Sequence, residues 1–310
     1  MTNILVTGCA GCVGHSMVEE LSQNPDWHIF AFVKRPENLQ LNLKAMANVT
    51  VVKADLYQLG DVEAYIKRAD AIVHLAAGWS GQAAYDLNVT ETLHLFALAD
   101  MQRCQQVIYF STASIMDEQN RLLAAAAHGS DYIASKYQMY QRLRETVFYE
   151  RMTVIFPTAV IGGGPGHPYS HIAKGLQQAK DWIAYLRFVS LDAGFHFIHA
   201  EDLAKVTRHL LQKPRQAHLE LVLGQPYITL AAALVEIAQA HGYRVPFQLP
   251  LPTGFLMVLV KLFKKDMTEW DRFCVDHRHF HYQTTSPADL GVQSRFETLQ
   301  ACVTDLINFG

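Results

Sequence analysis

The sequence lacks the features that mark membrane-spanning, strongly basic and secreted proteins. Its 310 residues contain no apolar run of the roughly 20 residues that a membrane-spanning helix needs. Lys and Arg (26) nearly balance Asp and Glu (29), and the formal net charge of −3 gives no indication of a nucleic-acid partner. The segment Met1-Thr2-Asn3 leads directly into an apolar run, so we expect no signal peptide.

Cysteine is also scarce. The five cysteines show no disulfide-like framework, which favours a reducing compartment, and we expect a cytoplasmic protein. Cys9 and Cys12 form a Cys-x-x-Cys pair, but the sequence has no second such pair to complete a zinc site. The alternative interpretation of this pair is an oxidant-sensitive thiol of low pKa at a helix N-terminus.

Histidine, in contrast, is abundant, with 15 residues, and its densest run is His277-Arg278-His279-Phe280-His281. In a strand these three histidines would share one face and could bind a metal. Only Cys274 and Asp276 stand nearby as further ligands. We therefore predict no metal site and interpret the run as a polar surface segment near the substrate pocket.

The hydrophobic content of 50% is ample for a large core, and the chain carries no internal repeat or low-complexity tract. Short apolar runs alternate with segments of helical periodicity. This alternation predicts a doubly wound α/β fold with a parallel sheet. We expect strands near residues 3–7, 28–33, 49–53, 71–75, 106–111, 152–156 and 219–223.

The first strand leads into a glycine-rich loop that runs from Thr7 to Gly14. A strand, a glycine turn and a helix form the context of a dinucleotide-binding fingerprint. In this pattern the glycines permit a tight turn, a close approach to the pyrophosphate and close helix packing. The helix N-terminus then offers N–H groups to the phosphates. The predicted cofactor-binding positions here are Gly8, Cys9, Ala10, Gly11, Cys12, Val13 and Gly14. The alternative is a glycine-rich turn without a ligand.

The strand at 28–33 ends in Lys34-Arg35-Pro36. An acidic residue at this place would accept hydrogen bonds from the adenosine ribose of NAD. Two cations favour a 2′-phosphate instead, so we predict NADP, with NAD as the alternative. A solvated surface pair is the other interpretation of Lys34 and Arg35.

Tyr132-Ile133-Ala134-Ser135-Lys136 is the second informative string. The two ends are four residues apart, so on a helix the phenol and the ammonium project from one face. A nearby ammonium lowers the pKa of a phenol, so Tyr132 could exchange a proton with a substrate oxygen. In isolation, such a pair is more often an ordinary pair on a helix surface.

Further segments resemble the extended short-chain dehydrogenase/reductase superfamily over most of the chain. The segments that resemble its motifs are 51–56, 71–77, 88–92, 107–112, 156–162, 197–203 and Tyr282 with 286–291. The last of these is similar to the hydroxysteroid dehydrogenase and dihydroflavonol reductase branch. The superfamily also contains NAD-dependent epimerases and dehydratases.

The resemblance implies roles for individual residues. Thr112 would supply the catalytic hydroxyl, with Ser111 and Ser114 as alternatives. Lys136 would also bind the nicotinamide ribose, and the superfamily's helices, here 85–102 and 132–149, would form a homodimer. The remaining cofactor contacts implied are Asp55 and Leu56 at the adenine, Leu75, Ala76 and Ala77 along the cofactor, and Pro157 and Thr158 beside the nicotinamide.

Several residues depart from the superfamily's pattern. Met116-Asp117 replaces the usual Tyr-Gly, Phe156 replaces an Arg, and Glu91 replaces a Gly. The first two changes weaken the case for a nucleotide-sugar epimerase. The expected pocket wall is apolar, has few cations, and comprises Trp79, Tyr169, Trp182, Tyr185, Phe188, Phe195 and residues 255–263.

We therefore predict an NADP-dependent oxidoreductase that acts on a secondary alcohol or ketone of a small, partly apolar substrate. The alternatives are an NAD-dependent nucleotide-sugar epimerase or dehydratase, and a non-catalytic NADP-binding regulatory protein. The expected dinucleotide-binding domain spans 1–161 and 196–224, and the substrate lobe spans 162–195 and 225–310. Residues 254–260 predict either a lid helix or, less favoured, an interfacial one.

Overall fold

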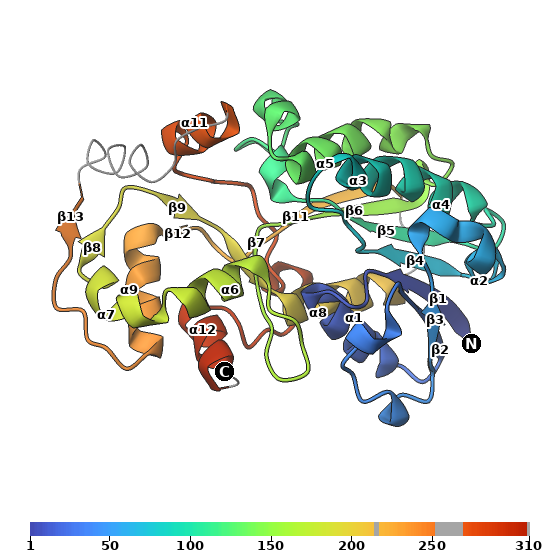
Figure 1. The fold of residues 1–310 in the computed structure, drawn as a ribbon, viewed down its shortest axis with the longest axis horizontal. Coiled ribbons are helices and arrows are strands. Elements are labelled where there is room, and N and C mark those ends of the chain that lie inside the picture. Colours follow the sequence, from blue (N-terminus) through green and yellow to red (C-terminus); the bar gives the residue numbers. More distant parts are fainter. Residues whose placement is uncertain (214–216, 252–268, 309–310) are drawn as a thin grey trace.

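The computed structural model describes residues 1–213, 217–251 and 269–308. Its centre is a seven-stranded parallel sheet with the order β11-β6-β5-β4-β1-β2-β3 (Figure 1). The strands are β1 (Thr2–Thr7), β2 (Trp27–Val33), β3 (Val49–Lys53), β4 (Ala71–His74), β5 (Gln106–Phe110), β6 (Met152–Pro157) and β11 (Leu219–Leu223). All seven predicted strands and the doubly wound α/β fold are confirmed.

The strand residues alternate between two apolar cores, one on each face of the sheet. Leu5 packs toward α2 (Glu63–Lys67), α4 (Thr92–Leu98) and α5 (Asp131–Arg142), whereas Ile4 and Val6 pack toward α1 (Cys12–Ser22) and α8 (Ala200–Gln212). Figure 1 shows these two helical layers on opposite sides of the sheet. Because helices cover both faces of the sheet, the sequences of the strands are continuous apolar runs.

The strand order reverses between β1 and β4, which are neighbours although two other strands separate them in sequence. The loops that leave these two strands therefore diverge at their carboxyl ends. Doubly wound sheets bind ligands in the crevice at this point. The glycine-rich loop follows β1 there, and Leu75-Ala76-Ala77 follows β4.

A smaller lobe lies beside the carboxyl ends of the strands (Figure 1). Its helices are α6 (His171–Gln178), α7 (Ile183–Leu186), α9 (Leu230–Ala240) and α12 (Leu299–Asn308). Its strand pairs are β12 (Ile228–Thr229) with β9 (Gly194–Phe195) and β13 (Leu249–Pro250) with β8 (Val189–Ser190). The remaining elements are β7 (Ala159–Ile161), which pairs with β10 (Phe197–His199), and the short helices α3 (Gln82–Tyr85) and α11 (Glu269–Asp276).

Three expectations from the sequence concern a lid helix, a membrane-spanning helix and a metal site. Residues 254–260, predicted as a lid or interfacial helix, lie outside the described residues. Across the described ranges, no helix is both long and apolar enough to span a bilayer. Within the same ranges, no three His, Cys, Asp or Glu side chains are arranged to hold a metal ion.

Candidate active site

The glycine loop is shaped by two contacts that leave no room for a side chain. Gly8 has φ +74°, a conformation that favours glycine, and a Cβ there would lie 2.7 Å from the backbone nitrogen of Ala76. A Cβ on Gly14 would overlap the carbonyl oxygen of Gly8. The loop therefore packs directly against the chain after β4 and against its own helix.

The first turn of α1 is free to bind an anion. Its N-cap, Gly11, makes no side-chain hydrogen bond, and the first turn contains no acidic residue. The Gly11 N–H itself donates to the Gly8 carbonyl at 3.0 Å and closes the turn. An uncapped helix N-terminus behind a glycine turn fits the pyrophosphate of a dinucleotide.

The two cysteines of this loop have raised pKa values. Cys9 is fully buried and donates from its Sγ to the Val6 carbonyl at 3.1 Å. Burial raises the pKa of Cys9 well above its usual range and that of Cys12 to about 12. The alternative of a low-pKa thiol is therefore wrong, because the desolvation of Cys12 outweighs a backbone hydrogen bond at Ser170 and the charge of Lys174.

Lys34 and Asp55 meet at the carboxyl ends of β2 and β3. Their side chains form an ion pair of 2.9 Å, and the Lys34 ammonium lies 5.6 Å from the ring centre of Tyr57. Burial opposes ionisation of Asp55, but hydrogen bonds from Lys34 and the Tyr57 N–H outweigh it and lower its pKa. Arg35 is exposed beside this pair. Leu56, which follows Asp55, is buried.

A buried chain of hydrogen bonds joins the ends of β1 and β4 and was missed by sequence reasoning. The Thr7 hydroxyl accepts the N–H groups of Leu75 and Ala76, each at 3.2 Å, and lies 2.9 Å from His74 Nδ1. His74 Nε2 lies 3.0 Å from the Thr92 hydroxyl, which donates to the Leu87 carbonyl.

The direction of these bonds fixes the form of His74. The Thr7 hydroxyl already accepts two N–H groups, so its own proton goes to Nδ1. The Thr92 hydroxyl donates its only proton to the Leu87 carbonyl, so it accepts from Nε2, which carries the imidazole proton. Burial lowers the pKa of His74 to about 3, with a smaller effect from Lys136. A neutral His74 therefore holds the loop after β4 in place.

Thr112 and Tyr132 come together at the carboxyl end of β5. The Tyr132 side chain is hydrogen-bonded to that of Thr112, and Thr112 Oγ1 also donates to Ser114 Oγ at 3.3 Å. The alternative hydroxyl on Ser111 is buried and has no hydrogen-bond partner among the described residues. Thr112 is thus the hydroxyl that contacts the phenol.

Lys136 reaches deeper than Tyr132 from the same helix. Its Nζ donates to the Phe110 carbonyl at 2.8 Å and to the Tyr109 hydroxyl at 3.3 Å. Burial lowers the pKa of Lys136 to about 7 and raises that of Tyr132 to about 12. The expected lowering of the Tyr132 pKa is not found, because only the Thr112 hydrogen bond opposes the desolvation of the phenol.

The expected nicotinamide-side residues lie on a turn that is fixed to β11. The N–H and the hydroxyl of Thr158 both donate to the Leu223 carbonyl, at 3.0 and 3.1 Å. Pro157, the last residue of β6, pairs with Leu223 in the sheet register. The hydroxyl proton of Thr158 is therefore used in this hydrogen bond and is not free to bind a ligand.

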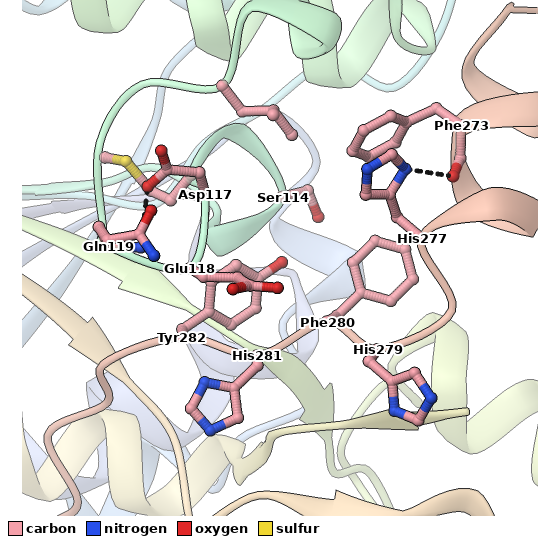
Figure 2. Close-up of a pocket in the computed structure, with 12 residues that line it drawn as sticks. Ser114, Asp117, Glu118, Gln119, Phe273, His277, His279, Phe280, His281 and Tyr282 are labelled. Atoms are coloured by element: carbon pink, nitrogen blue, oxygen red, sulfur yellow. Dashed lines mark hydrogen bonds between the residues drawn. The ribbon is translucent and has the colours of Figure 1, made fainter. Parts of the chain in front are cut away.

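A cavity of about 230 Å³ opens beside Ser114. Its wall comes from two segments far apart in sequence, 114–123 and 273–282, whose side chains face each other across it (Figure 2). Twelve of the described residues line it: Ser114, Met116, Asp117, Glu118, Gln119, Leu123, Phe273, His277, His279, Phe280, His281 and Tyr282. The histidine run therefore lines a pocket.

None of the individual residues expected in the pocket wall lines this cavity; they are Trp79, Tyr169, Trp182, Tyr185, Phe188 and Phe195. The other part of the expected wall, 255–263, lies outside the described residues. Trp182 and Tyr185 are 65% and 71% exposed on the lobe surface. Their segment, unlike 114–123 and 273–282, does not reach this cavity. Trp79, in contrast, stacks on Tyr132 with 4.4 Å between ring centres. Periodicity could not find segment 273–282, since its place depends on a long-range contact of β9 with Arg278 and His279.

Comparison with solved structures supports this fold. The structure of gox2253 has a TM-score of 0.75 at 18% identity and covers 100% of this chain and 98% of its own. The dTDP-glucose 4,6-dehydratase of Bacillus anthracis, solved with NAD, has a TM-score of 0.69 at 18% identity, covering 99% and 96%. The UDP-glucose 4-epimerase of Bifidobacterium longum, with NAD+ and UDP, has a TM-score of 0.67 at 16% identity, covering 99% and 98%.

Sequence comparison then identifies the family. None of the curated proteins has a sequence that matches the chain. The model of the NAD dependent epimerase/dehydratase family matches residues 4–224, which include the glycine loop, His74, Thr112, Tyr132 and Lys136. The chain belongs to this family and is an NAD(P)-dependent enzyme of the extended short-chain dehydrogenase/reductase type.

Proposed function

We propose that this protein is an NADP-dependent oxidoreductase that interconverts a secondary alcohol and a ketone on a small, partly apolar substrate. The observation that carries the proposal is the hydrogen-bonded pair of Tyr132 and Thr112 beside the cavity at Ser114. A phenol and a hydroxyl so placed can hold one substrate oxygen and exchange a proton with it.

The two residues divide the work at that oxygen. Bound nicotinamide would supply or accept the hydride. Tyr132, protonated at neutral pH because its pKa is about 12, donates the proton in the direction of reduction. Thr112 would orient the same oxygen, and Lys136, which reaches the carboxyl end of β5 from α5, would hold the ribose hydroxyls of the cofactor.

The choice of NADP is supported by the cations at the end of β2. Lys34 is held by Asp55 at 2.9 Å, and Arg35 stands exposed next to it, so both can approach a 2′-phosphate. Asp55 neutralises part of this charge. We expect tighter binding of NADPH than of NADH, measured by energy transfer from Trp to the nicotinamide. Tighter binding of NADH would contradict it.

The chemistry of the cavity supports an uncharged substrate. None of the twelve described residues that line it is Lys or Arg, and two of them, Asp117 and Glu118, are carboxylates. A diphosphate needs cations or free N–H groups, and the Glu118 carboxylate would repel it, whereas the charge of Asp117 is paired with Arg121 at 2.9 Å. We also propose a cytoplasmic location and a homodimer, the latter testable by sedimentation.

A nucleotide-sugar epimerase or dehydratase is the second candidate. It is favoured by the match of both lobes to structures named as a dTDP-glucose 4,6-dehydratase and UDP-sugar epimerases, over 99% of this chain. Such an enzyme would hold NAD tightly and bind a nucleotide diphosphate sugar. Copurification of NAD, or a calorimetric signal with UDP-glucose or dTDP-glucose, would favour it over the oxidoreductase.

The variant Tyr132→Phe tests the oxidoreductase directly. It removes only the phenol oxygen, so we expect turnover of a panel of ketones with NADPH to fall by about 100-fold or more. NADPH affinity should stay within about twofold of the wild type, because the variant leaves the glycine loop and Lys136 intact. Retained turnover would refute the role of Tyr132.

A further inference from the structure

Trp79 covers the ring of Tyr132. The two rings are 4.4 Å apart between centres and nearly parallel, with an angle of 18° between their planes. The indole also contacts the imidazole of His171 at 4.3 Å, with a tilt of 56°. Despite these two contacts, 55% of Trp79 is exposed. A large apolar side chain therefore keeps an open surface directly over the phenol assigned to catalysis.

The loop that carries Trp79 is fixed on both sides. Gly78 donates its N–H to Asn88 Oδ1 at 2.7 Å and accepts from Asn88 Nδ2 at 2.9 Å. Gly81, with φ +69°, donates its N–H to Asp131 Oδ2 at 2.7 Å, next to Tyr132. The position of the indole is thus set by the backbone and not by burial of the side chain.

This arrangement differs from that of an ordinary surface tryptophan. Trp182, which is 65% exposed, makes one aromatic contact among the described residues, to Tyr185 at 6.4 Å between ring centres. Trp79 instead joins three elements, the loop after β4, α5 through Tyr132 and α6 through His171. A bonded loop that presents an exposed indole at a reacting group is built to contact a ligand.

The geometry also limits what that ligand can be. A substrate oxygen that bonds to the hydroxyls of Tyr132 and Thr112 places its carbon beside the phenol ring. A substituent on that carbon then comes within reach of the open indole surface. Aromatic rings prefer offset-stacked or edge-to-face contacts with such a surface.

We propose that Trp79 is a specificity-determining residue that selects substrates with an aromatic ring attached to the reacting carbon. His171 supports the indole from its other side. The proposal rests on the proposed oxidoreductase function, which it deepens by naming a substrate class. An aromatic contact of this kind favours a planar ring over a saturated one by about 2- to 10-fold.

The test compares two probes of similar size, acetophenone and cyclohexyl methyl ketone, with NADPH. For the wild type, we expect kcat/KM to favour acetophenone. In Trp79→Leu this ratio should fall by about 2- to 10-fold, and Trp79→Phe should restore most of it. Trp182→Leu is the matched control and should leave the ratio unchanged. An unchanged ratio in Trp79→Leu would overturn the proposal.

Two further measurements separate this proposal from the proposed function. Ketone turnover that survives Tyr132→Phe would refute the function, whereas a ratio that does not respond to Trp79 would refute only the selectivity. NADPH affinity should be equal in Trp79→Leu and the wild type. A loss of affinity would mean that Trp79 contacts the cofactor, which overturns the assignment.

A binding measurement covers the case in which the wild type reduces neither ketone. With NADP+ bound, acetophenone should quench tryptophan fluorescence in the wild type and in Trp182→Phe, but much less in Trp79→Phe. Equal quenching in the wild type and Trp79→Phe, or no quenching in the wild type, would overturn the proposal.

Discussion

The two halves of the molecule are stabilised in different ways. The nucleotide-binding half has strands of four to seven residues in one sheet and an apolar core on each face. The lobe has strand pairs of only two residues and exposes Trp182, Tyr185 and Phe247. The first half can hold backbone groups in place for a cofactor that many enzymes share. The second half leaves side chains free to vary with the substrate.

The active site shows the same contrast on a smaller scale. The proposed cofactor side is made by backbone contacts, such as that between Gly14 and the Gly8 carbonyl. The proposed substrate side is made by side chains from loops, such as Trp79, Ser114 and Tyr282. Substitutions should therefore have sharper consequences on the cofactor side.

The largest effect is expected for Gly14→Ala. The added Cβ would overlap the Gly8 carbonyl oxygen, and backbone on both sides of the contact cannot give way cheaply. We expect NADPH affinity to fall by about 100-fold or more, or the protein not to fold. Fluorescence titration with NADPH and a thermal unfolding curve would measure both outcomes.

Gly60→Ala is the matched control, because a Cβ at Gly60 meets nothing within 4 Å. It should leave NADPH affinity and thermal stability close to those of the wild type. Equal behaviour of the two variants would show that the close backbone contact does not set the cofactor side.

An intermediate effect is expected for His74, which joins β1 and β4. Its folded pKa of about 3 lies below the ordinary value of 6.5, so between these values only the unfolded chain binds the proton. The stability that His74 contributes is therefore complete above pH 6.5 and lost as the pH falls toward 3. We expect His74 alone to account for a loss of about 2 kcal/mol in the free energy of unfolding between pH 8 and pH 5.

The measurement is urea unfolding of the wild type and His74→Leu at both pH values. The variant leaves the hydroxyls of Thr7 and Thr92 without their imidazole partner, which costs about 1–3 kcal/mol at pH 8. Its disadvantage should shrink at pH 5, because it has no imidazole to protonate. His199, with a folded pKa of about 3, is present in both proteins and cancels. A constant difference would contradict the prediction.

The smallest effect is expected on the lobe surface. Tyr185 is 71% exposed, so Tyr185→Ser should change the free energy of unfolding by about 0.5 kcal/mol or less. Ile183, two residues earlier, is 4% exposed and belongs to the lobe core. Ile183→Ala should cost about 2–5 kcal/mol in the same urea experiment. Similar costs for both would mean that Tyr185 is covered in solution.

The sequence alone determined the regular secondary structure of this protein and its glycine-rich turn. The apolar runs and the glycine spacing predicted all seven sheet strands, the parallel fold and the family, because strand burial and tight turns depend on residues close together in the chain. The four-residue spacing of Tyr132 and Lys136 correctly placed both on α5.

Only the tertiary structure decided the electrostatics of the site and the wall of the pocket. The Tyr132 pKa is raised and Lys136 bonds to the Phe110 carbonyl because both groups are buried among residues distant in sequence. His74 joins the ends of β1 and β4 because Thr7 and Thr92 bond to its two ring nitrogens. Segment 273–282 lines the cavity because it pairs with β9. Desolvation and long-range contacts depend on how elements pack together, and local sequence does not encode that packing.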